Sequence, residues 1–173
     1  GFWSAFRWSW SIISANFCNV VDVGDSGFYY AFHNASYFQS ANFHSVVNVG
    51  GNAFYYAFHD TSVTDLDFSS LQNVEISGFN HAFTNSPYLQ HVSFPSLLWA
   101  NSYGFSSAFQ NCVSLVSAEF NSLTTTRGFS FDNAFNGCVN LKTLLMPNLT
   151  SFAGFANMCR DCISLQEINF CNA

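Results

Sequence analysis

The chain has 173 residues, of which 19% are aromatic and only 8% are charged, and its formal net charge is −6. With four Lys and Arg in total, it has no basic patch that could neutralise phosphates, so we expect no nucleic-acid binding. Polar residues interrupt every apolar stretch well before about 20 residues, so we expect no membrane span. Neutral Ser, Thr, Asn and Gln must then hydrate the surface, which suits an extracellular or particle-surface setting.

The dipeptide Ala-Phe recurs at a nearly constant interval of 25 or 26 residues, which indicates a repeat protein. A fixed period of this size is typical of a solenoid, in which short units stack and share one core. We therefore expect a single solenoid over residues 1–173, with about seven units of 24–26 residues. Residue 1 is a Gly at a unit boundary, so we also expect a fragment of a longer chain. The units begin near residues 1, 27, 53, 78, 104, 130 and 154.

Each unit opens with a segment that has helical spacing. A small residue and Phe are followed three residues later by Ala, and apolar positions three and four apart predict a helix of about two turns. Three residues after the Ala comes a residue that tolerates the left-handed conformation in which helices end. Only the first unit departs from this rule, with Trp8. The predicted helix-ending residues are Asn34, Asp60, Asn85, Asn111, Gly137 and Asp161.

A strand is predicted next in each unit. The pattern Leu115-x-x-Ala118-x-Phe120 ends in the two-residue alternation of a strand with one buried face. Another apolar residue follows three positions later, as at Leu123, so the chain is expected to bend back into the core there. The third unit keeps the pattern from Val63 onward, after a one-residue deletion.

These units resemble the BspA-type leucine-rich repeats of bacteria. The similarity is clearest from Ala108 to Leu149, which includes Ala134-Phe-Asn-Gly-Cys-Val-Asn-Leu. The resemblance implies an α/β fold: a right-handed solenoid with a parallel sheet on its concave side and short helices on its convex side. Two departures, a longer insert before each Gly-Phe and many core Phe residues, imply a wider coil. The family is associated with bacterial attachment to host molecules.

The cysteines are predicted to be structural. One repeat position holds Cys112, Cys138 and Cys162, and other units have Ser, Ala or Thr there. We therefore expect this position to hold a small buried side chain. Disulfides between successive units are not expected, because convex helices would hold them about a helix diameter apart. Cys159 and Cys162 form a lone Cys-x-x-Cys, which is a weak zinc or redox signal. Near-surface thiols are expected at two equivalent positions after the strand, Cys18 and Cys171.

No catalytic, metal-binding or cofactor-binding residues are predicted, and the chain is not expected to be an enzyme. The His residues fall in different columns or on a solvated face, whereas a metal site needs several ligands that converge. Asp67 and Glu119 would stand two strands apart, roughly 10 Å. That separation lies at the far edge of the range for inverting glycosidases.

Two surfaces remain as candidates for binding a partner. The first is an aromatic ridge, which could contact sugars or a protein, or whose rings could simply pack on one another; it comprises Trp3, Tyr29, Tyr30, Tyr55 and Tyr56. The second is the concave face, where we single out Gln39, Asn42, Asp65, Asp67, His91 and Glu119.

The function predicted from these surfaces is non-enzymatic adhesion to a protein or glycan on a host or neighbouring surface, by a bacterial surface protein or a particle fibre. The alternative is a structural subunit that associates with its own copies into a filament or particle surface.

Overall fold

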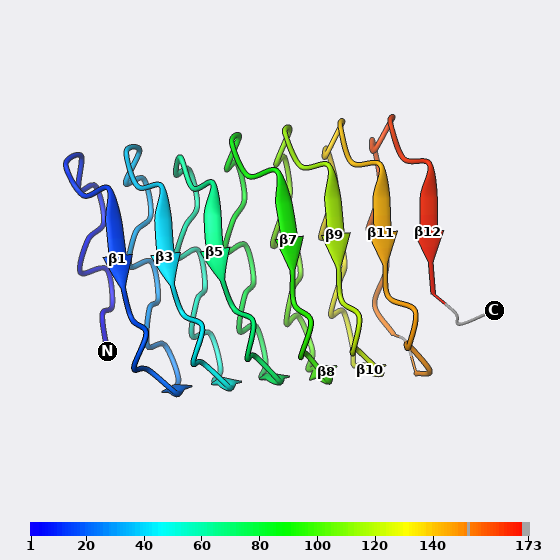
Figure 1. Cartoon of the computed structure of the whole chain (residues 1–173), viewed down its shortest axis with the longest axis horizontal. Coiled ribbons are helices and arrows are strands. Elements are labelled where there is room, and N and C mark those ends of the chain that lie inside the picture. The colour runs from blue at the N-terminus through cyan, green and yellow to red at the C-terminus, as the bar shows by residue number, and fades with distance from the viewer. Residues whose placement is uncertain (152, 171–173) are drawn as a thin grey trace.

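The computed structural model describes residues 1–151 and 153–170, and these residues form a parallel β-solenoid. Each coil lies beside the next along the long axis of the molecule (Figure 1). One wall, which we call the strand face, carries a three-residue strand from each coil. Its strands are β1 (Ser14–Asn16), β3 (Ser40–Asn42), β5 (Asp65–Asp67), β7 (His91–Ser93), β9 (Ser117–Glu119), β11 (Thr143–Leu145) and β12 (Glu167–Asn169).

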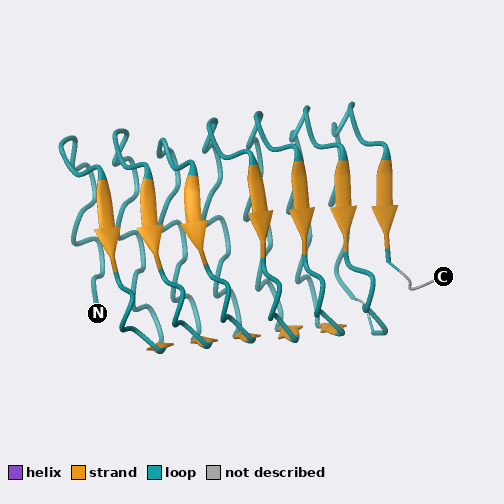
Figure 2. Ribbon diagram, in the orientation of Figure 1, coloured by secondary structure: helices purple, strands orange, loops and turns teal. Residues whose placement is uncertain are grey.

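A second strip of very short strands lies where the coils turn at the other edge, and Figure 2 shows both strips joined by turns. The strip is one continuous five-stranded parallel sheet in the order β10-β8-β6-β4-β2. These strands are β2 (Asp22–Val23), β4 (Asn48–Val49), β6 (Asn73–Val74), β8 (Trp99–Ala100) and β10 (Thr125–Thr126).

The predicted short helices are wrong: none of the described residues is helical. The segments form a wall of overlapping β-turns instead, which we call the turn wall. Alternate N–H groups donate to the carbonyl three residues earlier, and the N–H groups between them donate to the next coil. In coil two the bonds to the next coil run from Phe28, Tyr30 and Phe32 N–H to the carbonyls of Ala53, Tyr55 and Ala57, at 2.7, 2.9 and 2.8 Å.

Left-handed residues, spaced four apart in coils one to five, prevent a helix. In coil two these residues are Ser26, Tyr30 and Asn34, with φ of 55°, 55° and 59°. A helix needs consecutive right-handed residues, whereas a β-turn of type II requires a positive φ at its third residue. The left-handed conformation expected for the helix-ending column is confirmed, at Asn34, Asp60, Asn85, Asn111, Gly137 and Asp161, and Trp8 shares it with φ of 60°.

The core consists of Phe ladders that run along the solenoid. Phe54 is fully buried, and its ring stacks between those of Phe28 and Phe79 at centroid distances of 5.1 and 5.0 Å. A parallel ladder includes Phe58, and the strand face supplies a third that includes Phe43. Rings of the strand-face ladder meet those of the Phe54 ladder edge to face, as Phe43 and Phe54 do, which is a favourable aromatic geometry. The apolar positions predicted for helix and strand therefore do face one core.

The cysteine column is a column of hydrogen-bond donors. Cys112 and Cys138 are fully buried and free, as predicted. Each donates its S–H to a carbonyl of the preceding coil, at 3.1 and 3.0 Å, and Ser86 does the same with its hydroxyl at 3.1 Å. The predicted separation of successive cysteines by a helix diameter is wrong. Turns rather than helices stack here, and successive coils are hydrogen-bonded neighbours. Cys171 lies outside the described residues.

Candidate functional site

The strand face is interrupted between coils three and four. Its strands form two separate sheets, β1-β3-β5 and β12-β11-β9-β7, so β5 and β7 are adjacent but unpaired. Figure 1 shows the wider space between these two strands. We call this junction the sheet break. It coincides with a deletion in the sequence. Between Thr61 and Val63, just before the strand, coil three has one residue fewer than the other coils have at this place.

Backbone hydrogen bonds define the sheet break. On one side of it Phe43 N–H donates to Asp67 C=O at 3.0 Å, and on the other side Phe94 N–H donates to Glu119 C=O at 2.9 Å. Within the described part of the chain, the equivalent bond from Phe68 N–H to Ser93 C=O is missing. Among the described strands of this face, β5 and β7 therefore leave backbone donors and acceptors without a partner strand, whereas the other neighbours are paired.

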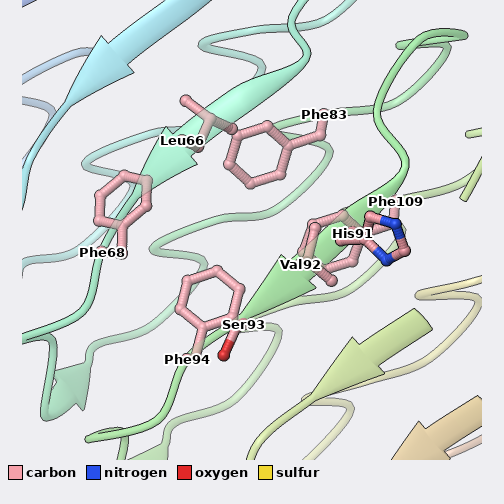
Figure 3. A pocket seen from close by; sticks show the side chains of 8 residues that line it. All are labelled: Leu66, Phe68, Phe83, His91, Val92, Ser93, Phe94 and Phe109. Carbon is pink, nitrogen blue, oxygen red and sulfur yellow. The ribbon is translucent and has the colours of Figure 1, made fainter. Parts of the chain in front are cut away.

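Side chains fill most of the space beneath the sheet break. The Phe68 and Phe94 rings are 6.0 Å apart and tilted by 25°, compared with 5.0 Å and 7° for Phe43 and Phe68. The remaining gap has a volume of about 10 Å³, no more than one water molecule needs, so no ligand enters the core. Figure 3 shows Leu66, Phe83 and Val92 around this gap.

Above the gap, the surface carries a groove of about 370 Å³ with polar walls. Asp65 and Asp67 line one wall, and His91 and Ser93 line the other, so three of the six predicted strand-face residues meet here. A second depression of about 330 Å³ shares both carboxylates and extends over β3 to β1. The carboxylates stand two residues apart on one strand and so project from the same face. This part of the face carries negative charge without a Lys or Arg on β1, β3, β5 or β7.

The other predicted strand-face residues lie outside the groove. Asn42 ends β3 and its side-chain oxygen accepts the His44 N–H at 3.0 Å. Gln39 lies against an exposed apolar hollow that includes Trp10 and Tyr37. Glu119 accepts a hydrogen bond from the Asn121 side chain at 3.3 Å.

The aromatic ridge is a stack whose ring faces are covered. Tyr29 stacks on Tyr55 at 5.0 Å and 9°, and Tyr30 stacks on Tyr56 at 5.1 Å and 4°. Only Trp3, which is 66% exposed, caps the stack at its end. Each of the four half-buried Tyr rings thus has at least one face covered by a neighbouring ring.

Histidines flank this stack in a poorly hydrated setting. Burial, reinforced by nearby His59 and Arg7, lowers the pKa of His33 to about 4. Burial also lowers the pKa values of His59 and His81, and it raises those of the Tyr30, Tyr55 and Tyr56 hydroxyls. These groups are therefore neutral near pH 7, which suits packing within the wall.

Within residues 1–151 and 153–170, no group of three or more His, Cys, Asp or Glu is arranged to hold a metal ion. Over the same residues there is no helix of the length and hydropathy needed to cross a membrane. The groove offers carboxylates and hydrogen-bonding groups, and on its far side His91 Nδ1 lies 2.8 Å from the Ser117 hydroxyl of β9.

Comparisons with known proteins agree with this architecture. The model of the BspA type leucine rich repeat region matches in six copies, over residues 4–126 and 55–173. The solved leucine-rich repeat protein of T. pallidum is 19% identical, with a TM-score of 0.51 over 94% of this chain and 87% of that one. No curated protein matches the chain.

Two further structures have lower scores. A leucine-rich repeat protein from Bacteroides ovatus is 18% identical with a TM-score of 0.41, over 90% of this chain and 48% of that one. A leucine rich cell surface protein from Faecalibacterium prausnitzii is 18% identical with a TM-score of 0.37, over 96% of this chain and 62% of that one.

Proposed function

The chain belongs to the BspA-type leucine-rich repeat proteins, and we propose that it is a non-enzymatic, extracellular binding module whose groove at the sheet break recognises a protein surface carrying Lys or Arg. The observation that carries this proposal is the convergence of Asp65 and Asp67 with His91 and Ser93 around the opening between β5 and β7. The extracellular setting rests on the composition alone, since neutral polar residues replace charge on the surface.

Charge favours a cationic partner. Carboxylates form strong, bidentate hydrogen bonds with guanidinium groups, and paired carboxylates raise the local concentration of cations. The unpaired Ser93 carbonyl adds a neutral acceptor at the same groove, because no described backbone donor reaches it across the sheet break. An Arg side chain, with its five donors, fits such a set of acceptors better than a sugar does.

The covered ring faces argue against glycan binding through the aromatic ridge. Sugar recognition by aromatic residues uses the ring face, and in Tyr29 and Tyr55 these faces are stacked on each other. A protein partner is therefore the favoured class, and the groove is the favoured place.

The test measures the affinity of an Arg-rich peptide for three proteins by titration calorimetry at about 0.15 M salt. The double variant Asp65→Asn/Asp67→Asn removes both groove carboxylates. The matched control Asp22→Asn/Asp25→Asn changes the net charge equally at exposed carboxylates of the other edge. We expect the groove variant to bind at least about tenfold more weakly and the control to bind as the original chain does.

Equal losses in both variants would mean non-specific charge attraction and would overturn the proposal, as would the absence of binding to the original chain. Binding to a neutral oligosaccharide array that is lost when Tyr29, Tyr30, Tyr55 and Tyr56 are changed to Ser would place the site on the aromatic ridge. That result would also overturn the proposal.

A further inference from the structure

Two neighbouring thiols in the last described coil belong to neither candidate binding surface. Cys159 occupies the ladder position that Phe135 holds one coil earlier, and Cys162 continues the donor column. Both side chains are half-buried, whereas Cys112 and Cys138 are fully buried. Reagents in solution can therefore reach this pair and not the inner members of the column.

One β-turn holds the two residues together. Cys162 N–H donates to Cys159 C=O at 3.2 Å, and Asp161 has φ of 61°, as the third residue of a type II turn requires. The end residues of such a turn have Cα atoms less than about 7 Å apart, which overlaps the range of about 4.4–6.8 Å in disulfides. The Cys162 S–H donates to the Phe135 carbonyl of the preceding coil at 3.0 Å, so its sulfur lies on the inner side of this turn.

We propose that Cys159 and Cys162 close to a disulfide when the chain meets a low-molecular-weight disulfide oxidant such as oxidised glutathione. The Cys162 thiolate attacks one glutathione sulfur, forms a mixed disulfide and displaces one glutathione thiolate. The Cys159 sulfur then attacks the Cys162 sulfur, gives its proton to solvent and displaces the second glutathione. The protein thiols lose two electrons and two protons, and oxidised glutathione is reduced to two molecules of glutathione.

The surroundings select this pair over the other thiols. Interaction between the two neighbouring thiols raises the pKa of Cys159 and lowers that of Cys162, so Cys162 supplies the attacking thiolate. Burial raises the pKa of Cys112 to about 12 and also raises that of Cys138, so both remain protonated. Their S–H groups donate to carbonyls of the preceding coil, as that of Cys162 does, but neither has a second thiol three residues away in the same turn.

The sequence allows a direct test, because trypsin cleaves between the two cysteines. The chain is incubated with oxidised glutathione under native conditions, its free thiols are blocked with iodoacetamide in denaturant, and it is then digested. Cleavage after Arg127, Lys142 and Arg160 separates Cys138, Cys159 and Cys162 into three peptides. We expect the peptide 143–160 to remain linked to the peptide that begins at residue 161, and to be released by reductant.

Three variants complete the test. Because Cys171 lies in the same peptide as Cys162, the link must persist in Cys171→Ser and be lost in Cys162→Ser. Cys112→Ser should leave it unchanged. Full iodoacetamide labelling of both Cys159 and Cys162, a stable glutathione adduct without the link, or a link to the peptide that holds Cys138 would each overturn the proposal.

Discussion

At the junction of coils three and four, the turn wall continues without a gap whereas the strand face opens. On the turn wall, Phe58 stacks on Phe83 at 5.4 Å and 2°, and Phe58 N–H donates to Ala82 C=O at 2.8 Å. On the strand face, Phe68 and Phe94 spread to 6.0 Å and no strand pairing joins them. Each wall therefore has its own hydrogen bonds and ring stack, so a one-residue deletion can open one wall and leave the other intact.

The largest expected effect comes from removing a ring from the intact wall. Phe58→Ala should lower the free energy of unfolding by about 3–5 kcal/mol, because it leaves a cavity inside a closed ladder. Phe68→Ala should lower the free energy of unfolding by an amount near the lower end of that range. The neighbouring gap gives the surrounding side chains room to move into the cavity. Urea denaturation measures both losses of unfolding free energy. A larger loss for Phe68→Ala than for Phe58→Ala would show that the strand face contributes more than the turn wall to the stability of this junction.

The next effect tests the backbone conformation of the turn wall. Asn133 has φ of 55° in the left-handed column. A β-branched residue resists this conformation, so Asn133→Val should cost about 1–2 kcal/mol of unfolding free energy. Asn133→Gly should cost little, and Thr143→Val on strand β11 should be neutral or stabilising. Equal costs for Val on both walls would contradict the assignment of left-handed turns.

Restoring the missing residue should close the sheet break. One Tyr inserted after Ser62 gives coil three the spacing of its neighbours, and each backbone hydrogen bond recovered should add about 0.5–1.5 kcal/mol. Amide hydrogen exchange reports the result directly. In the original chain Phe68 N–H should exchange faster than Phe43 and Phe94 N–H, and in the insertion variant it should match them. An unchanged exchange rate at Phe68 N–H in the insertion variant would show that the deletion does not cause the sheet break.

Acidification should weaken the fold through His33 on the turn wall. Its pKa is about 4 in the folded chain and about 6.5 when unfolded, so the unfolded state binds more protons between these values. Stability should therefore fall as the pH drops from 6.5 toward 4. The urea midpoint of His33→Gln should fall less over this window than that of the original chain. His44→Gln, at an exposed position, should behave as the original chain does.

The repeat in the sequence was sufficient to predict the solenoid, the buried Phe and Ala positions and the parallel strands. It could not distinguish a helix from overlapping turns, because both place residues spaced three and four apart on one side. The distinguishing column holds Tyr30, Tyr56 and His81, and bulky residues such as Tyr rarely adopt positive φ. They do so here because their N–H groups bond to the next coil, and one unit taken alone does not contain that partner.

For the candidate site, Asp65, Asp67 and His91 could be placed on the strand face from their alternation with buried residues. Their gathering at an opening could not be predicted from that alternation. The available signal was the deletion before Val63, whose consequence depends on how coil three packs against coil four.

The hydrogen bonds between coils also determine how the chain gains and loses its structure. Partners such as Phe28 and Ala53 are one coil apart, and among residues 1–151 and 153–170 no backbone hydrogen bond along the turn wall skips a coil. Folding can therefore begin at any adjacent pair and propagate by nearest neighbours. Pulled by its two ends, such a chain should yield coil by coil, each coil releasing roughly 80–90 Å of extended backbone. At the sheet break, the strand-face bonds that oppose such a force between the other described strands are missing.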